Sequence, residues 1–177
     1  EGTPPVIYRD KLNRSTTSGW INSSWGTTVD FASTQRVHTP PLSIAADFQS
    51  PWAGLSFTGA QEFDRVQTGA LRFAFQAESA GQDLFVVVYG RNGAVLLNTP
   101  VTTFIPGGVI GQGTWYQITV PYSYFAAGPI VSVSFQSRYA SRFYFDEIRF
   151  VHDDGSVMFG EGFNGGWKDY SWQSTRY

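Results

Sequence analysis

The side chains of this sequence that could catalyse a reaction are mainly acids, because the chain has only two histidines and no cysteine. Nothing in the sequence places His38 and His152 together, and a histidine triad or multi-histidine metal site would need that. Paired carboxylates can also hydrolyse glycosides. Three such pairs are Glu62 with Asp64, Asp146 with Glu147, and Asp153 with Asp154. Neighbours on a strand point to opposite faces, and clustered loop acids are usually solvated. The sequence therefore predicts a protein that is not an enzyme.

A second group of candidates consists of aromatic side chains with amide or guanidinium partners. A flat ring can stack on an apolar ligand face, while amides and guanidinium groups hydrogen-bond to hydroxyl edges. Sugar rings offer both kinds of surface, so the combination is typical of carbohydrate binding. The candidates are Trp52, Tyr89, Gln76, Arg72, Arg91, Gln136, Tyr139, Trp20 and Trp25. Trp52 follows Ser50-Pro51 in a predicted loop and is the first choice for an exposed ring, whereas we assign Trp115 to the core.

The composition favours β-structure and excludes several kinds of partner. Aromatic residues make up 17% of the chain and charged residues 15%, compared with a usual ~25% charged. The formal net charge is −2, and the basic residues are scattered. We therefore expect neither nucleic acid nor a membrane as a partner. The absence of cysteine excludes disulfide bonds and thiolate metal sites.

Alternating apolar and polar residues indicate the elements that must position these side chains. The alternation is clear at 71–77 and 131–136, and a period of two is the pattern of a half-buried strand. It places Gln76 and Gln136 opposite the apolar stripes, where we expect a concave sheet to present them. Strands are predicted at 6–11, 19–31, 42–48, 54–58, 69–78, 83–91, 94–97, 101–104, 114–121, 129–137 and 142–151. The predicted fold is all-β, a two-sheet antiparallel β-sandwich of jelly-roll type.

The two ends of the chain carry nearly the same pattern. The segment GWINSSW at 19–25 is matched by GWKDYSW at 166–172, so that both tryptophans align. Tryptophan is rare, and internal similarity of this kind indicates a repeat with a domain-sized period. We therefore predict one β-sandwich domain at 1–151. Residues 152–177 would be a linker with the opening strands of a second repeat, or a strand-donating tail.

A further set of segments occurs in one order along the chain: IYRDKL, HTPPLSIAADF, LRFAFQ, GTWYQITVP and FYFDEIRF. With these segments the chain resembles the jelly-roll carbohydrate-binding modules attached, often in tandem, to secreted polysaccharide-degrading enzymes. The resemblance covers about residues 6–151. It implies a structural calcium ion held by Asp10 and Asp146, and calcium takes ~6–8 oxygen ligands. The alternative is that both acids are surface or strand-end charges making ordinary hydrogen bonds.

Together these observations predict a secreted, extracellular protein that binds a cell-wall or extracellular polysaccharide by aromatic stacking and hydroxyl hydrogen bonds. An alternative is a structural repeat subunit of a fibre or surface layer, joining neighbouring copies of itself through the C-terminal strands. A glycoside hydrolase or lyase comes third. Asn13 and Asn22 each begin an Asn-x-Ser sequon, which would carry a glycan in a secreted eukaryotic protein.

Overall fold

Two antiparallel sheets pack face to face in the computed structural model, which describes residues 6–9, 11, 12, 20–63 and 69–151, without the side chains of residues 60, 61 and 63. Sheet A contains β1 (Val6–Tyr8), β3 (Thr27–Ser33), β4 (Ser43–Phe48), β6 (Ala70–Ala77), β9 (Trp115–Pro121) and β11 (Ser141–Val151). Sheet B contains β2 (Trp20–Asn22), β5 (Gly54–Phe63), β7 (Leu84–Tyr89), β8 (Val95–Pro100) and β10 (Ile130–Ser137). Three short 3-10 helices complete the described part: η1 (Arg91–Gly93), η2 (Val101–Phe104) and η3 (Tyr122–Tyr124).

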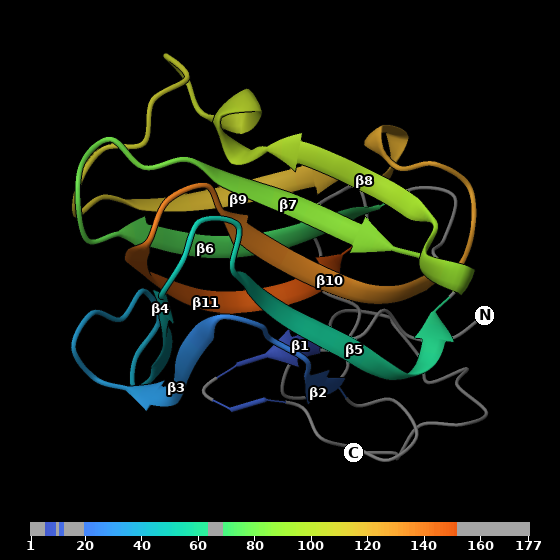
Figure 1. Cartoon of the computed structure of the whole chain (residues 1–177), viewed down its shortest axis with the longest axis horizontal. Helices are drawn as coiled ribbons and strands as arrows, with labels where there is room; N and C mark the ends of the chain where they lie inside the picture. The colour runs from blue at the N-terminus through green and yellow to red at the C-terminus, as the bar shows by residue number, and fades with distance from the viewer. Residues whose placement is uncertain (1–5, 10, 13–19, 64–68, 152–177) are drawn as a thin grey trace, which may run out of the picture.

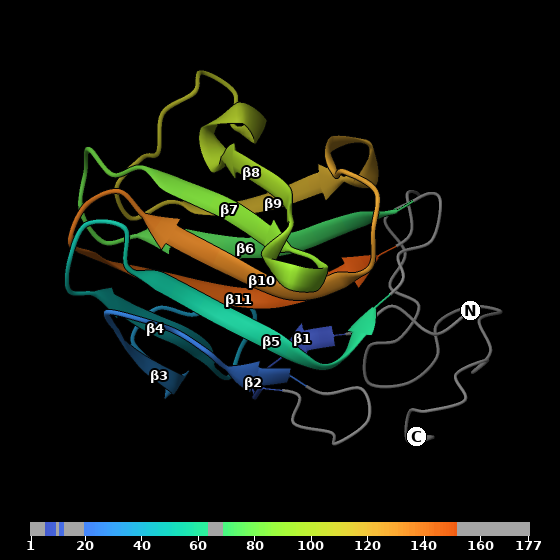
Figure 2. The same ribbon diagram turned by 45° about the vertical axis from the view of Figure 1, so that its right-hand side comes forward.

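The strand order in sheet A is β3-β4-β11-β6-β9, with β1 also paired to β11, and in sheet B it is β2-β5-β10-β7-β8. Sheet B lies in front of sheet A in Figure 1, and the turned view in Figure 2 shows the two layers. The predicted two-sheet jelly-roll sandwich is therefore confirmed. None of the helices in the described residues is long and apolar enough to span a membrane. The predicted second repeat or strand-donating tail at 152–177, and with it assembly through the C-terminal strands, lies outside the described residues.

The core is a layer of aromatic rings between the sheets. Phe135 of β10 lies 4.7 Å from Phe73 of β6 and 4.9 Å from Phe145 of β11, measured between ring centroids. All three side chains are fully buried. Because these alternate residues point inward, the residues between them must point to the two outer faces of the sandwich. The period-two pattern in the sequence thus decides which side chains reach solvent.

The segment predicted as one strand at 19–31 contains, within its described residues, parts of two strands in different sheets. β2 pairs with β5 in sheet B, whereas β3 pairs with β4 in sheet A. The chain turns between them because the Ser24 backbone N–H and hydroxyl donate to the Asn22 side-chain oxygen, at 3.1 and 2.5 Å. Gly26 then adopts φ +57°, a conformation that glycine reaches without steric cost. The single-strand prediction was wrong because it did not weigh this local turn chemistry.

Other boundaries also differ from the prediction, since β1 ends at Tyr8 and β8 extends to Pro100. Residues 101–104, predicted as a strand, form the 3-10 helix η2, which the Ile105 N–H closes by donating to the Thr102 carbonyl at 3.2 Å. The strand predicted at 54–58 continues as β5 to residue 63. Of the added residues, residue 63 pairs with Ile130 of β10 beyond a register shift, and Gly59 pairs with Trp20 of β2. Sequence alternation alone did not reveal this extension.

The Trp25 ring packs against Gly54 of β5 and so connects the loop before β3 to sheet B. Trp25 and Gly54 form a β-bridge, with backbone hydrogen bonds of 3.0 and 2.9 Å. A Cβ atom at Gly54 would lie less than 3.0 Å from three atoms of the Trp25 ring. The indole therefore lies against the backbone of β5, which only glycine permits at this position.

Replacing Gly54 tests this packing contact with Trp25. We expect Gly54→Ala to lower the free energy of unfolding by about 1–3 kcal/mol, because the added methyl group overpacks the ring. Chemical denaturation of the wild type, Gly54→Ala, Trp25→Ala and the double variant measures the effect. In the Trp25→Ala background the cost of Gly54→Ala should largely vanish. If Gly54→Ala lowers the free energy of unfolding equally in both backgrounds, Trp25 does not pack against Gly54 as described.

Candidate functional site

The predicted binding residues fall on different parts of the sandwich. Gln76 and Arg72 belong to β6 and face outward from sheet A, whereas Gln136 belongs to β10 and faces outward from sheet B. The prediction that Gln76 and Gln136 share one concave sheet is therefore wrong. Their strands follow the same alternation, but sheet membership depends on long-range pairing, which parity does not encode.

Trp20, also predicted to contact the ligand, is a core residue. Its side chain is 2% exposed, and its ring lies 6.3 Å from that of Phe150 at an interplanar angle of 27°. Trp20 pairs with Gly59 of β5, and its parity directs the side chain inward. Because it does not reach solvent, it cannot stack on a ligand, and we correct this prediction.

An open groove of about 480 Å³ lies over sheet A near the β6–β9 edge. Its lining residues are Arg36, Val37, Gln76, Glu78, Gln112, Gly113 and Trp115. The groove thus combines an indole ring with amide, carboxylate and guanidinium groups. Of the residues selected from the sequence, only Gln76 lines it.

The floor of the groove comes from two adjacent strands. Gln76 of β6 pairs with Trp115 of β9, and both point outward because Phe75 and Ile118 point into the core. Trp115 is half-buried, and its ring and the His38 ring form a T-shaped pair, with centroids 5.4 Å apart and an interplanar angle of 62°. The sequence analysis wrongly assigned Trp115 to the core. Its outward parity, shared with polar residues 117 and 119, is the signal that could have identified it.

One wall of the groove is the loop at 34–42, which leaves β3 and reaches across β4 and β11 to β6. Arg36 Nη1 donates to Gln76 Oε1 at 3.0 Å, and the Arg36 guanidinium lies 5.4 Å from the centroid of the Tyr144 ring. The Tyr144 hydroxyl donates to Gln35 Oε1 at 3.1 Å. These contacts hold Arg36 and Gln76 in place before any ligand arrives.

The opposite wall is the loop that precedes β9. Gly113 N donates to the Ala77 carbonyl at 2.9 Å, and Gln112 Nε2 donates to the Glu78 carbonyl at 3.2 Å. Gly111 N donates to the Tyr116 hydroxyl at 2.7 Å. Backbone and side-chain hydrogen bonds thus fix this wall to the end of β6, so both sides of the groove are preorganised.

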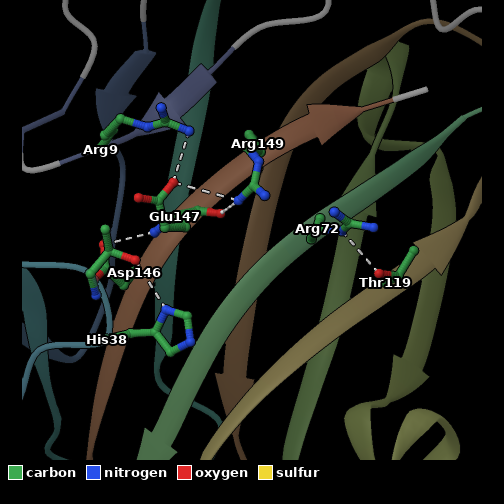
Figure 3. Close-up of polar contacts among 8 residues, drawn as sticks. Arg9, His38, Arg72, Thr119, Asp146, Glu147 and Arg149 are labelled. Atoms are coloured by element: carbon green, nitrogen blue, oxygen red, sulfur yellow. Dashed lines mark hydrogen bonds and ion pairs between the residues drawn. The ribbon is translucent and has the colours of Figure 1, made fainter. Parts of the chain in front are cut away.

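Asp146 attaches the loop at 34–42 to sheet A. Its side chain is fully buried; Oδ2 accepts the Thr39 N–H at 2.8 Å and Oδ1 accepts the Glu147 N–H at 2.8 Å. Figure 3 shows Asp146 at the bulge of β11. The buried carboxylate therefore satisfies two backbone donors that would otherwise lack these partners.

The predicted calcium site is not supported by a ligand set in the described residues. Asp10 lies outside them, and they contain no group of three His, Cys, Asp or Glu side chains that could hold a metal ion. Asp146 makes ordinary hydrogen bonds to two backbone donors, as in the alternative, but it is fully buried within β11 and is therefore neither a surface nor a strand-end charge. Calcium binding therefore stays a prediction.

A cluster of charged residues lies beside Asp146 on sheet A (Figure 3). Glu147 Oε2 lies 2.9 Å from Arg9 Nη2 and 3.5 Å from Arg149 Nη1. Burial lowers the pKa of the Arg149 guanidinium, and the negative charge of Glu147 opposes this shift. Arg72 Nε donates to Thr119 Oγ1 at 3.1 Å. Arg72 is thus on the same face as the groove but is not part of its lining.

The outer face of sheet B carries the other predicted aromatic residues. Trp52 is 48% and Trp25 is 41% exposed, and Gln136 Nε2 lies 3.5 Å from the Tyr89 hydroxyl. Tyr139, in the turn after β10, is 43% exposed. Four of the residues selected from the sequence are therefore brought together on this face, with Tyr139 near its end.

Arg91 and the sequons lie elsewhere. Arg91 forms an ion pair with Glu62, and its hydrogen bonds hold the pKa of Glu62 below its usual value. Asn22 is exposed, and its side-chain oxygen accepts hydrogen bonds from Ser24. Asn13 lies outside the described residues. Glycosylation at either sequon stays a prediction.

Comparison with known proteins supports the fold. No family model and no curated protein matches the chain. A solved family 29 carbohydrate binding module is 14% identical, with a TM-score of 0.60 over 89% of this chain and 95% of that chain. A mutant of such a module in complex with cellulohexaose is also 14% identical, with a TM-score of 0.60 over 88% of this chain and 97% of that chain.

A further mutant, in complex with mannohexaose, is 14% identical, with a TM-score of 0.57 over 84% of this chain and 91% of that chain. These similarities confirm the predicted jelly-roll fold of a carbohydrate-binding module. At this level of identity they bear on the fold, so the ligand of this chain has to be argued from its own residues.

Asp146 can be tested by mutation. We expect Asp146→Ala to lower the free energy of unfolding by about 1–3 kcal/mol, because the buried Glu147 N–H and the part-buried Thr39 N–H lose their acceptor. Urea denaturation measures the loss, and Asp47→Ala, which removes an exposed acid from β4, is the control. An Asp146→Ala protein as stable as the control would contradict the anchoring role.

The calcium prediction has its own test. A bound calcium ion stabilises the folded state by mass action, so the melting temperature should rise with added CaCl₂ and fall with EDTA. Calorimetric scans of the wild type under both conditions measure this difference. Identical scans would show that calcium is not a structural ligand.

Proposed function

We propose that the protein binds a polysaccharide in the groove over sheet A, without covalent chemistry. The observation that carries this proposal is the half-buried Trp115 ring on the floor of an open groove that is otherwise lined largely by polar groups. A sugar ring has an apolar C–H face that can stack on the indole. Its hydroxyl edge requires donors and acceptors at the sides.

The walls of the groove offer both hydrogen-bond donors and hydrogen-bond acceptors. Arg36 supplies a guanidinium donor, Gln76 and Gln112 supply amides, and Glu78 supplies a carboxylate acceptor. Hydrogen bonds of Arg36 and Gln112 to the protein already orient these walls. Ligand binding therefore costs little conformational entropy of these side chains. The family 29 modules of the same fold, solved with cellulohexaose and mannohexaose, support a chain of hexose units as the ligand.

The proposed role is recognition alone. Because the groove is open to solvent, it can accommodate part of a longer polysaccharide chain. Since such polymers occur in cell walls and extracellular matrices, we also propose that the protein works outside the cell.

The test is a panel of soluble polysaccharides in affinity electrophoresis. The panel contains glucomannan, mixed-linkage β-glucan, xylan and xyloglucan, with the wild type and Trp115→Ala. We expect retardation of the wild type by at least one glycan. Trp115→Ala should bind that glycan at the groove at least about tenfold more weakly, as is typical when a central aromatic contact is removed.

The matched control is Tyr124→Ala, which removes a 51% exposed aromatic side chain in η3, away from the groove. Melting temperatures of all variants separate loss of binding from loss of fold. If the wild type is retarded by no glycan in the panel, the proposed function is wrong. If Trp115→Ala binds as tightly as Tyr124→Ala, the groove is not the site.

A further inference from the structure

Two arginines lie opposite each other on the outer face of sheet A. Arg149 of β11 pairs with Arg72 of β6, although like charges directly opposite on neighbouring strands repel each other. The register of β11 against β6 shifts between Asp146 and Arg149, and Glu147, within this bulge, has φ +51°. Because the shift turns Ile148 into the core, Arg149 points outward beside Arg72. The chain thus adopts a costly backbone conformation that brings two guanidinium groups to one face.

The arginine cluster, formed by Arg9, Arg72 and Arg149, has fewer acids than bases. Glu147 Oε2 lies 2.9 Å from Arg9 Nη2 and 3.5 Å from Arg149 Nη1, and Figure 3 shows Arg149 between Glu147 and Arg72. Asp146, the other acid beside Arg149, already accepts two backbone N–H groups. Within the described part of the chain, the cluster therefore keeps an excess of positive charge.

Arg149 has a hydrogen-bond donor that the protein does not use. The residue is 8% exposed, and its Nε has no acceptor among the residues that the structure describes. Its Nη1 donates to the Glu147 carbonyl at 3.0 Å, so Glu147 does not occupy the fork formed by Nε and Nη2. This fork matches two oxygens of a carboxylate or a sulfate group. A buried donor without an acceptor is destabilising, and such an anion would satisfy it.

The electrostatics of Arg149 also favour an anion. Burial lowers the pKa of its guanidinium, the charge of Glu147 opposes this shift, and the charges of Arg72 and Arg9 lower the pKa further. The repulsion among the three cations therefore exceeds what Glu147 alone relieves. A second negative charge between Arg149 and Arg72 would reduce it.

The cluster lies on the same face as the groove. Arg72 and Gln76 point outward from β6, and their partners on β9 are Thr119 and Trp115. Four residues along a strand span about 13 Å, so a polymer that follows the two strands from Trp115 would reach Arg72. Because Arg72 is only partly buried, the cluster is accessible from the β6 side.

We propose that Arg149, Arg72 and Arg9 bind the carboxylate or sulfate group of an acidic polysaccharide whose neighbouring units occupy the groove. The inference rests on the proposed function and deepens it, because it names the class of polysaccharide. The formal net charge of the chain is −2, so a polyanion is not attracted over a long range. Recognition therefore depends on short-range contacts with these guanidinium groups.

The experiment compares acidic polysaccharides with their neutralised forms at constant ionic strength, with the full chain. The probes are polygalacturonate, alginate and glucuronoxylan, each with its carboxyl-reduced form, and carrageenan with its desulfated form. Calorimetric titration measures the Kd of each probe. Melting scans with sodium galacturonate or sodium sulfate test whether a free anion occupies the cluster.

Two variants change the cluster, and a third serves as the control. Arg72→Gln removes a guanidinium from a partly exposed position, so we expect it to stay folded. Arg149→Lys keeps the charge but removes the planar fork. The matched control is Arg138→Gln, which removes the same charge from an exposed side chain at the opposite end of β11. Melting temperatures of all variants show whether the fold is retained.

We expect the wild type to bind at least one acidic polysaccharide at least about tenfold more tightly than its neutralised form. Arg72→Gln and Arg149→Lys should lose this preference and bind the neutralised form as the wild type does. Trp115→Ala should bind both forms more weakly, whereas Arg138→Gln should match the wild type throughout.

Four results would overturn the proposal. If the wild type binds acidic and neutralised forms equally, the groove takes a neutral glycan and the proposed function stands alone. If Arg138→Gln loses the preference as Arg72→Gln does, net charge causes it and no site exists. If no polysaccharide binds but galacturonate or sulfate raises the melting temperature of the wild type more than that of Arg72→Gln, the cluster holds a free anion and the proposed function fails. If neither polymers nor small anions have an effect, both proposals fail.

Discussion

The packing of Phe135 against Phe73 and Phe145 is the contact that ties the two sheets together and fixes the orientation of their strands. Once these rings point inward, every neighbouring residue on their strands must point outward. A slip of one residue would exchange the two sets completely, so the core also specifies what the outer surfaces contain. The groove over sheet A and the aromatic surface of sheet B are both consequences of this single constraint.

The two outer faces differ in how their buried polar and charged side chains find partners. On sheet A, the loop at 34–42 covers part of the face, so charged groups near β11 are buried and must be compensated. Glu147 lies between Arg9 and Arg149, and Asp146 accepts two backbone donors. Such compensation is required because an unpaired charge in a buried position is strongly destabilising. On sheet B, the outward Ser134 is fully buried, and its hydroxyl donates to the Val87 carbonyl at 3.0 Å. The described residues of sheet B include no buried charged side chain.

Much of the fold could be predicted from the sequence, because hydrophobic alternation is a local signal that each strand carries by itself. The division of β2 from β3 escaped the prediction, since it depends on the Asn22 turn and on Gly26. The site was harder to predict. Gln76 and Gln136 have equivalent patterns, and only the long-range pairing of β6 and β10 with their neighbours assigns them to different sheets. Trp115 shared its parity with polar residues, but its bulk and hydrophobicity favoured a place in the core. No sequence signal linked Thr39 to Asp146 across 107 residues.

The loop at 34–42 has a consequence for how such a protein can diversify. It supplies Arg36 and Val37 to the groove, yet neither residue belongs to the aromatic core. Its attachment depends largely on backbone groups, since Thr39 is held through its N–H and Arg36 through its carbonyl as well as its side chain. Substitutions at 36–38 can therefore alter the wall of the groove while the framework below is inherited unchanged. In evolutionary terms, the ligand preference of the groove can drift independently of the architecture that carries it.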